Sequence, residues 1–143
     1  MQNLINPRAF ESDSWVLYKS VLAGSGDDGT NVVSAAIANT GDFNYLKGLV
    51  VGTATLTSEK IATIVMELHH CDTSGGSYTK FADFDGSLVI DATGSAVFAS
   101  TVNCEGAKKF MKIAVKATLS ATETDTFVYH AVATKQALKK VEA

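Results

Sequence analysis

The chain has 143 residues, of which 46% are hydrophobic and 19% are charged, and its formal net charge is −3. This length predicts a single domain with a core of its own. The slight acidic excess argues against nucleic-acid binding, which needs a basic surface to neutralise phosphates. The apolar runs are too short to cross a membrane, and the start of the chain lacks the pattern of a secretory signal. We therefore expect a protein made in a cytoplasm.

Residues 1–14 mix polar and apolar types without a period, which predicts an extended N-terminal arm. A first strand is expected at 15–22, followed by a loop rich in Gly and Asp at 23–30. Residues 32–38 fit either a strand or a short helix, and we favour the strand. A turn at 40–44 precedes the more regular part of the chain.

From residue 46 onward, short strands alternate with turns rich in Gly, Asp and Ser, and we expect strands at 46–57, 61–71, 78–84, 87–91, 96–104, 108–119 and 126–136. Gly48 and Gly52 lie inside the first of these strands, where a bulge or close packing is expected. The dipeptide Asp85-Gly86 predicts a hairpin. Strand 108–119 alternates apolar and polar residues, which predicts one buried face made of Met111, Ile113, Val115, Ala117 and Leu119, with Lys112, Lys116 and Thr118 on the other.

About nine strands without βαβ alternation predict an all-β fold, an antiparallel β-sandwich that is jelly-roll-like. The sandwich domain is expected at 15–136, between the N-terminal arm at 1–14 and a charged C-terminal tail at 137–143. An immunoglobulin-like sandwich is the alternative, but its Cys–Trp–Cys spacing is missing because Trp15 precedes Cys71 and Cys104. Both cysteines are expected to be free buried thiols, with a disulfide between strand ends as the alternative.

Two short motifs resemble sites but are expected to be loops. Residues 24–29 match the G-x-G-x-x-G pattern of dinucleotide-binding folds, yet two acidic residues precede the last Gly and no helix follows. Asp72-Thr73-Ser74-Gly75 distantly resembles the Asp-Thr-Gly of aspartic proteases. Ser74 stands where that motif needs Gly, and the residue types are those that turns use.

Metal binding is considered at two places. His69-His70-Cys71-Asp72 offers four ligand types in a row, but neighbours on a strand point to opposite faces, so only His69 and Cys71 share a side. A zinc site would need the fold to bring another ligand, such as Cys104, to them. Asp83 and Asp85 could contribute to an irregular calcium site, and a hairpin is favoured there. We expect no metal and no cofactor, and we expect His130 to be a surface or hydrogen-bonded residue.

The chain contains no sequence motif of a known catalytic centre. G-x-S-x-G, the Walker loop, H-E-x-x-H and C-x-x-C are all missing from the sequence. We therefore expect no enzyme activity. The alternative is a small hydrolase whose active site is assembled from distant residues.

Aromatic residues near the N-terminus are the candidate partner contacts. An aromatic side chain on an arm either packs in the core or anchors a neighbouring subunit. For Trp15 we favour the core, and for Phe10 both interpretations are equally supported. The candidate contact residues are Pro7, Phe10 and Trp15.

Two segments resemble small virion proteins of tailed bacteriophages. Residues 68–83, LHHCDTSGGSYTKFAD, share a strand that ends in a polar turn, then Ser-Tyr-Thr and a short strand to Ala-Asp. Residues 104–115, CEGAKKFMKIAV, share the basic and aromatic start of a long strand, followed by a Thr/Ser turn at 119–122. The resemblance spans about residues 46–132.

This resemblance implies a capsid decoration (cement) protein or a related head accessory protein. Such a protein has a jelly-roll-like sandwich, binds the outside of an icosahedral shell as a homo-oligomer (dimer or trimer), and bridges subunits of the major capsid protein. No catalytic residues, nucleic acid or membrane are implied. The alternative function is a carbohydrate-binding or adhesion module, which predicts exposed aromatic residues on one face, with Tyr18, Tyr45, Tyr78 and Tyr129 as candidates.

Overall fold

The computed structural model describes residues 14–23, 31–120 and 124–138. These residues form ten strands, and no helix among them is long and apolar enough to cross a bilayer. The strands are β1 (Ser14–Ala23), β2 (Asn31–Val33), β3 (Ile37–Ala38), β4 (Phe43–Thr55), β5 (Ala62–Cys71), β6 (Thr79–Asp83), β7 (Leu88–Ile90), β8 (Gly94–Asn103), β9 (Phe110–Leu119) and β10 (Thr126–Leu138).

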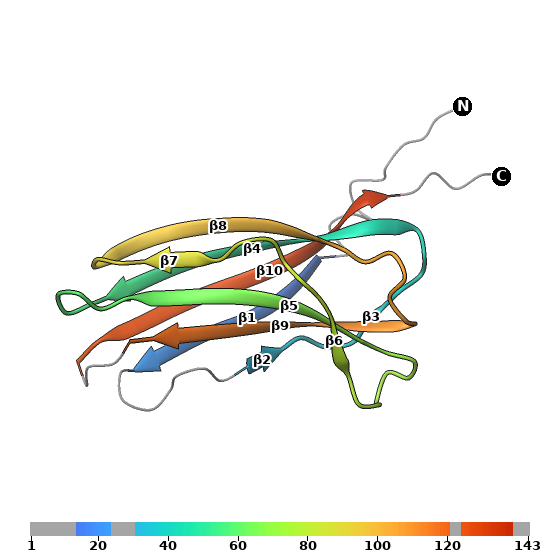
Figure 1. Ribbon diagram of the computed structural model, residues 1–143, viewed down its shortest axis with the longest axis horizontal. Helices are drawn as coiled ribbons and strands as arrows, with labels where there is room; N and C mark the ends of the chain where they lie inside the picture. Colours follow the sequence, from blue (N-terminus) through green and yellow to red (C-terminus); the bar gives the residue numbers. More distant parts are fainter. Residues whose placement is uncertain (1–13, 24–30, 121–123, 139–143) are drawn as a thin grey trace.

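The strands form two sheets that lie face to face along the long axis of the molecule (Figure 1). Sheet A has the strand order β1-β10-β4-β8. Sheet B has the order β2-β9-β5-β6, with β3 also paired to β9 and β7 also paired to β5. Every pairing is antiparallel. The predicted all-β antiparallel sandwich is therefore confirmed.

The strand order is that of a jelly roll. If β2 and β3 count as one interrupted strand, and β6 and β7 as another, the pairs are nested. The first strand pairs with the last, the second with the second last, and so on inward. Eight strands paired in this way make the two Greek keys of a jelly roll. This order decides between the two sandwich topologies that the sequence left open.

The predicted strand positions agree with the structure to within a few residues. Residues 32–38 form no helix but two short strands, β2 and β3, which both pair with β9. The turn predicted at 40–44 is shorter than expected because β4 begins at Phe43. Of the predicted arm, only Ser14 is described, as the first residue of β1. Likewise, β10 extends into the predicted tail as far as Leu138.

The hairpin predicted at Asp85-Gly86 is wrong. β6 and β7 do not pair with each other but lie one after the other along the same edge of β5. The segment between them interrupts the edge strand without reversing it, because Phe84 is buried and its N–H donates to the carbonyl of Met66. Asp85 then bonds to sheet A, where its N–H donates to the carbonyl of Thr101. Gly86 has φ +78°, which glycine adopts without strain.

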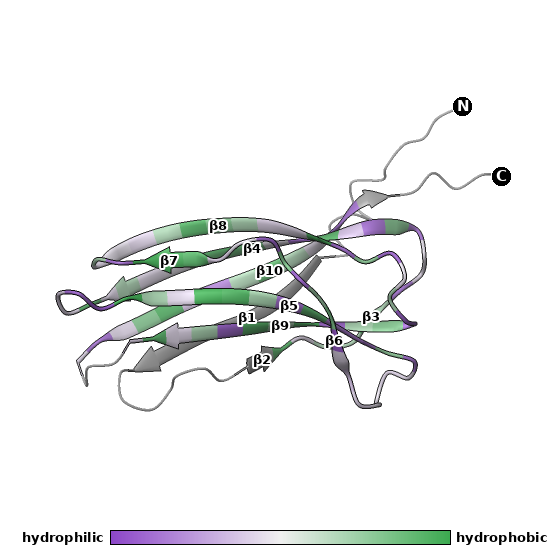
Figure 2. Cartoon of the chain, viewed as in Figure 1, coloured by the Kyte–Doolittle hydropathy of each residue, from purple (hydrophilic) through white to green (hydrophobic). Residues whose placement is uncertain are grey.

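The core lies between the two sheets and is built largely from alternate residues of β4, β5, β9 and β10. The predicted inner face of β9 is confirmed, with Met111, Ile113, Val115, Ala117 and Leu119 all buried. Figure 2 shows β5 and β9 hydrophobic over much of their length, with hydrophilic positions between. The inner face of sheet A contributes Leu46, Val50, Phe127 and Tyr129.

Gly48 and Gly52 make the close packing that the sequence predicts for β4. A Cβ atom on Gly52 would lie 2.8 Å from Cε1 of Phe127, and one on Gly48 would lie 2.7 Å from Cε of Met66. The buried ring of Phe127 is rigid, whereas the flexible end of the Met66 side chain can move aside. The two glycines therefore tolerate a methyl group differently.

We expect Gly52→Ala to lower the free energy of unfolding by about 1–3 kcal/mol, the usual effect of overpacking a core. Gly48→Ala should lower it by less, since the Met66 thioether can rotate away. Urea denaturation of both variants measures the difference. Gly75→Ala is the control, because nothing lies within 4 Å of its Cβ position. Equal losses of stability at Gly48 and Gly52 would contradict this difference between the rigid Phe127 ring and the movable Met66 side chain.

Candidate functional site

The outer face of sheet A carries a continuous apolar surface. Its centre consists of two rows of aligned residues across three strands: Val97–Val51–His130 and Ala99–Leu49–Val132. A third row, Ser95–Thr53–Val128, borders it, and the hydroxyls of Thr53 and Ser95 lie 2.8 Å apart. We call this surface the apolar band and define it by Leu49, Val51, Val97, Ala99, Val128 and Val132.

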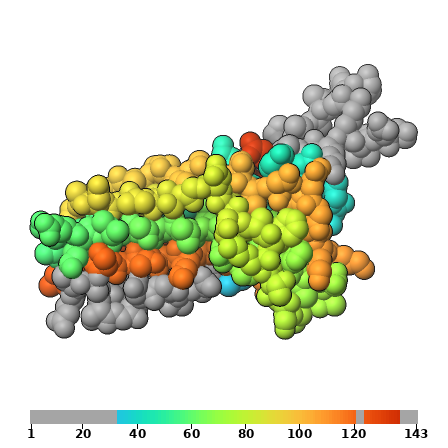
Figure 3. Space-filling model, in the orientation of Figure 1, coloured from blue at the N-terminus to red at the C-terminus, as the bar shows by residue number. Residues whose placement is uncertain are grey.

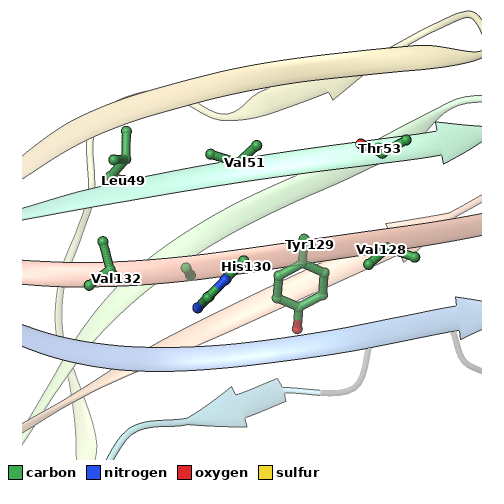
Figure 4. A pocket seen from close by; sticks show the side chains of 8 residues that line it. Leu49, Val51, Thr53, Val128, Tyr129, His130 and Val132 are labelled. Carbon is green, nitrogen blue, oxygen red and sulfur yellow. The ribbon is translucent and has the colours of Figure 1, made fainter.

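A shallow groove of about 580 Å³ runs over the part of the apolar band that β4 and β10 share (Figure 4). Leu49, Val51 and Thr53 line it from β4, and Val128, His130 and Val132 line it from β10. Tyr129 and Ala131 complete the lining, although their own side chains are buried. Among the residues that line the groove, His130 has the one exposed titratable side chain. The groove is therefore suited to apolar side chains rather than to a charged ligand.

Charged side chains gather at one end of the outer face of sheet B, whereas Val65 and Val89 are exposed elsewhere on this sheet. Nζ of Lys80 lies 3.2 Å from Oε2 of Glu67 and 2.6 Å from Oδ1 of Asp83. Nε2 of His69 lies 3.1 Å from the other carboxylate oxygen of Glu67. Nζ of Lys112 lies 4.5 Å from the ring centre of Tyr78. We call Glu67, His69, Lys80 and Asp83 the ion-pair cluster, which keeps this part of sheet B polar.

The pKa of the Glu67 carboxyl is lowered mainly by its hydrogen bond to His69; burial opposes this effect, and Lys80 adds to it. A carboxyl whose pKa is lower in the folded than in the unfolded state stabilises the fold above its unfolded pKa. That contribution is lost as the pH falls through its folded pKa.

We expect Glu67→Gln to lower the free energy of unfolding by at most about 1 kcal/mol near neutral pH, as is usual for partly exposed ion pairs. The difference from the unmodified chain should vanish on acidification below the folded pKa of Glu67. Urea denaturation at a series of pH values measures it. Glu59→Gln, which removes a carboxylate from an exposed turn residue, is the control variant. A difference in unfolding free energy that grows on acidification would contradict a lowered pKa of Glu67.

The candidate metal ligands are not brought together. His70 packs its ring against Phe81, at 4.8 Å between centroids, and its Nδ1 accepts a hydrogen bond from the N–H of Lys108. Neither cysteine is in a disulfide, but only Cys104 is buried, so the prediction of a buried thiol is wrong for Cys71. Within 14–23, 31–120 and 124–138 no group of three or more His, Cys, Asp or Glu residues could hold a metal ion.

The turn predicted at Asp72-Thr73-Ser74-Gly75 is confirmed. The N–H of Gly76 donates to the carbonyl of Thr73, and the carboxylate of Asp72 lies 3.4 Å from Nζ of Lys108. Asp83 belongs to the ion-pair cluster, and Asp85 follows it at the interruption between β6 and β7. The G-x-G-x-x-G motif at 24–29 lies outside the described residues.

The tyrosines predicted for a glycan-binding face do not gather on one surface. Tyr129 is 1% exposed and packs against Phe127 in the core, so its predicted exposure is wrong. Tyr45 is exposed on β4, whereas Tyr78 belongs with Lys112 on the outer side of sheet B. Tyr18 is placed only by its backbone, which pairs with Ala131.

The candidate contacts of the arm remain predictions. Pro7 and Phe10 lie outside the described residues. Trp15 is placed by its backbone alone, opposite Ala133 in β10. The apolar band was missed because its residues are far apart in the sequence, from Leu49 through Val97 to Val132, and meet only through the sheet order.

No protein-family model and no curated protein matches the sequence. Solved structures with a similar fold include the CBM36-1 domain of a multidomain xylanase from the hindgut metagenome of Trinervitermes trinervoides, at 10% identity and a TM-score of 0.49 over 85% of this chain and 94% of that one. The PBSX exported protein XepA matches at 8% identity and a TM-score of 0.49, over 91% of this chain but 38% of its own length.

The empty capsid of Triatoma virus matches at 6% identity and a TM-score of 0.46, over 94% of both chains. The similar structures thus include both carbohydrate-binding modules and virus capsid proteins. At these identities the likeness concerns the fold alone, and the fold is compatible with either class. The jelly-roll architecture of this chain follows from its own strand order.

Proposed function

We propose that this protein is a non-enzymatic virion component that binds the outside of an assembled phage capsid and stabilises it by bridging major capsid subunits. The sequence resemblance suggests the class, and the apolar band is the observation that carries the proposal. In this proposal the band lies against the shell. The ion-pair cluster on the opposite sheet then faces water.

The composition of the band favours a protein partner over a glycan. Exposed apolar patches rimmed by polar residues are typical of protein–protein contact sites. Glycan-binding faces instead need exposed aromatic rings, and Tyr45 is the one tyrosine with a described side chain exposed on sheet A. The rim of the band is polar, with Thr53 and Ser95 at one end and Lys47 and Thr101 at the other. This pattern of apolar centre and polar rim matches the anatomy of protein interfaces.

The proposed mechanism is mechanical and needs no chemistry. A ligand that binds the assembled shell and not its free subunits stabilises the shell by mass action. The proposed clasp consists of the N-terminal arm and the start of β1, with Pro7, Phe10 and Trp15 as its contacts. The arm leads into β1, which lies beside β10 in sheet A and so adjoins one side of the groove.

We expect the purified chain to co-sediment with assembled, expanded shells of the major capsid protein and not with free capsid subunits. Deleting residues 1–12 should weaken shell binding by about tenfold or more, since a terminal anchor adds apolar contact that the sheet face alone lacks. Circular dichroism checks that the truncated protein folds. Equal binding by the truncated and full-length chains would remove the arm from the proposal, and failure of the full chain to bind shells would refute the proposed function.

A further inference from the structure

β8 forms one edge of sheet A and lacks the usual protection of an edge strand. Exposed edges are normally protected by charged residues, Pro, bulges or short length, because their free backbone groups can pair with another chain. β8 is ten residues long, contains no charged residue and no Pro, and pairs with β4 without a register shift. The edge strands of sheet B have such protection, because β2 is only three residues long and β6 carries Lys80 and Asp83.

The orientation of the backbone groups of β8 follows from one hydrogen bond. The carbonyl of Thr101 accepts from the N–H of Asp85, so it points away from β4. In an antiparallel strand, the N–H and C=O of one residue point to the same side, and the side alternates along the chain. Ser95, Val97 and Ala99 therefore also direct their backbone groups to the open edge. Within the described residues no other backbone hydrogen bond between turns or loops reaches them.

The side chains of these same residues lie on the outer face of sheet A. Val97 is 67% exposed, more than any other large hydrophobic side chain whose burial is described. It lies in one row with Val51 of the apolar band. Figure 3 shows the yellow and orange atoms of β7 and β8 along one long border of the molecule. An open backbone edge thus coincides with the most exposed apolar side chain.

We infer that β8 pairs with β8 of a second copy of this chain, antiparallel and centred on Val97. In that register Val97 faces its own copy and Ser95 faces Ala99 of the other chain. Their edge-directed groups would form about six backbone hydrogen bonds. The carbonyl of Thr101 keeps its bond to Asp85. No like charges meet across the strands, because β8 has none, so self-pairing has no electrostatic penalty.

The second copy fits this edge better than a different partner does because the edge is complementary to itself. β-Branched residues opposite each other on one face of a sheet stabilise a strand pair, and Val97 would meet Val97. The two copies of sheet A would join into one continuous sheet around a two-fold axis, with both apolar bands on the same side. This inference concerns self-association in solution and does not depend on the proposed function.

The first test is the mass of the purified chain by light scattering as a function of concentration. A dimer is expected, and Val97→Lys should raise its dissociation constant by about a hundredfold, because two ammonium groups would then face each other across the axis. Val33→Lys is the matched control, since Val33 is 50% exposed on β2, the strand at the far edge of sheet B from β6 and β7. Circular dichroism checks the fold of both variants. A monomer at all concentrations, or a dimer unaffected by Val97→Lys, would overturn the inference.

A cysteine variant tests the same pairing of β8 with β8 if Val97→Lys fails to fold. At the centre of the proposed pair, the two Cα atoms of residue 97 would lie about 5.5 Å apart, within the range that a disulfide spans. In a Cys71→Ser background, which removes the half-buried native thiol, Val97→Cys should form a covalent dimer under mild oxidation. Val33→Cys in the same background should stay monomeric on a non-reducing gel. A failure of Val97→Cys to cross-link faster than Val33→Cys would also overturn the inference.

Discussion

Replacing Phe127 with alanine is expected to lower the free energy of unfolding by about 3–5 kcal/mol, the usual range for truncating a buried phenylalanine. Phe127 is fully buried, at 0% exposure, on the inner face of β10. Its ring centre lies 5.8 Å from that of Tyr129, and its edge fills the space that Gly52 leaves open on β4. Removing the ring would therefore leave a cavity in the core near one end of sheet A, where β10 begins. Urea denaturation measures the loss.

The neighbouring Val128 supplies the control, because its half-buried side chain points to the outer face. Val128→Ala should lower the free energy of unfolding by about 1 kcal/mol or less. A double-mutant cycle makes the test stricter. Gly52→Ala should cost less in the Phe127→Ala background than in the unmodified chain, since the ring it would strike is gone. Strictly additive losses would contradict direct contact between the two sites.

Val51→Asp is expected to weaken binding to assembled capsid shells by about a hundredfold. Val51 lies in the middle row of the apolar band, flanked by Val97 and His130, and is 46% exposed in the free chain. A carboxylate there would lose its water on docking without gaining a partner, which corresponds to about 3 kcal/mol. Co-sedimentation at graded shell concentrations gives the dissociation constant.

Val65→Asp is the matched variant on the opposite sheet. Val65 is 39% exposed in the middle of β5, and its neighbour on β9 is Lys116, which can pair with the new carboxylate. Shell binding should therefore stay within about twofold of the original value. If Val65→Asp weakens binding as much as Val51→Asp does, the apolar band is not the docking surface. Thermal melts of both variants exclude unfolding as the cause.

The sequence predicted the class of fold and most strand positions, because turns and alternation are local properties. β9 shows this most clearly, since the lysines and apolar residues alternate and the buried face can be read directly. β10 shows where alternation no longer reveals the buried face. Its outward residues include Val128 and Val132, while its inward residues include Ala131 and Ala133, so hydrophobicity alone does not tell which face is buried. The misassignment of Tyr129 follows from this ambiguity.

The hairpin prediction failed for a different reason. Asp85-Gly86 has the residues of a tight turn, but whether a turn reverses the chain depends on what its flanks bind. Here Phe84 enters the core and Asp85 bonds to the other sheet, so the strand resumes along β5. The apolar band could not be predicted for a similar reason, because it depends on which strands become neighbours. Leu49, Val97 and Val132 lie in strands that only the folded chain aligns.

The nested strand order has a consequence for how the protein is made. β10 lies between β1 and β4, yet of the ten strands it leaves the ribosome last. Until then, β1 has no neighbour in its sheet, and β4 and β8 form a separate pair. Sheets that depend on such distant pairings fold slowly, and their incomplete forms expose unpaired edges that promote aggregation. We therefore expect nascent chains that stall before residue 126 to be held by chaperones, and completion of β10 to commit the chain to its native state.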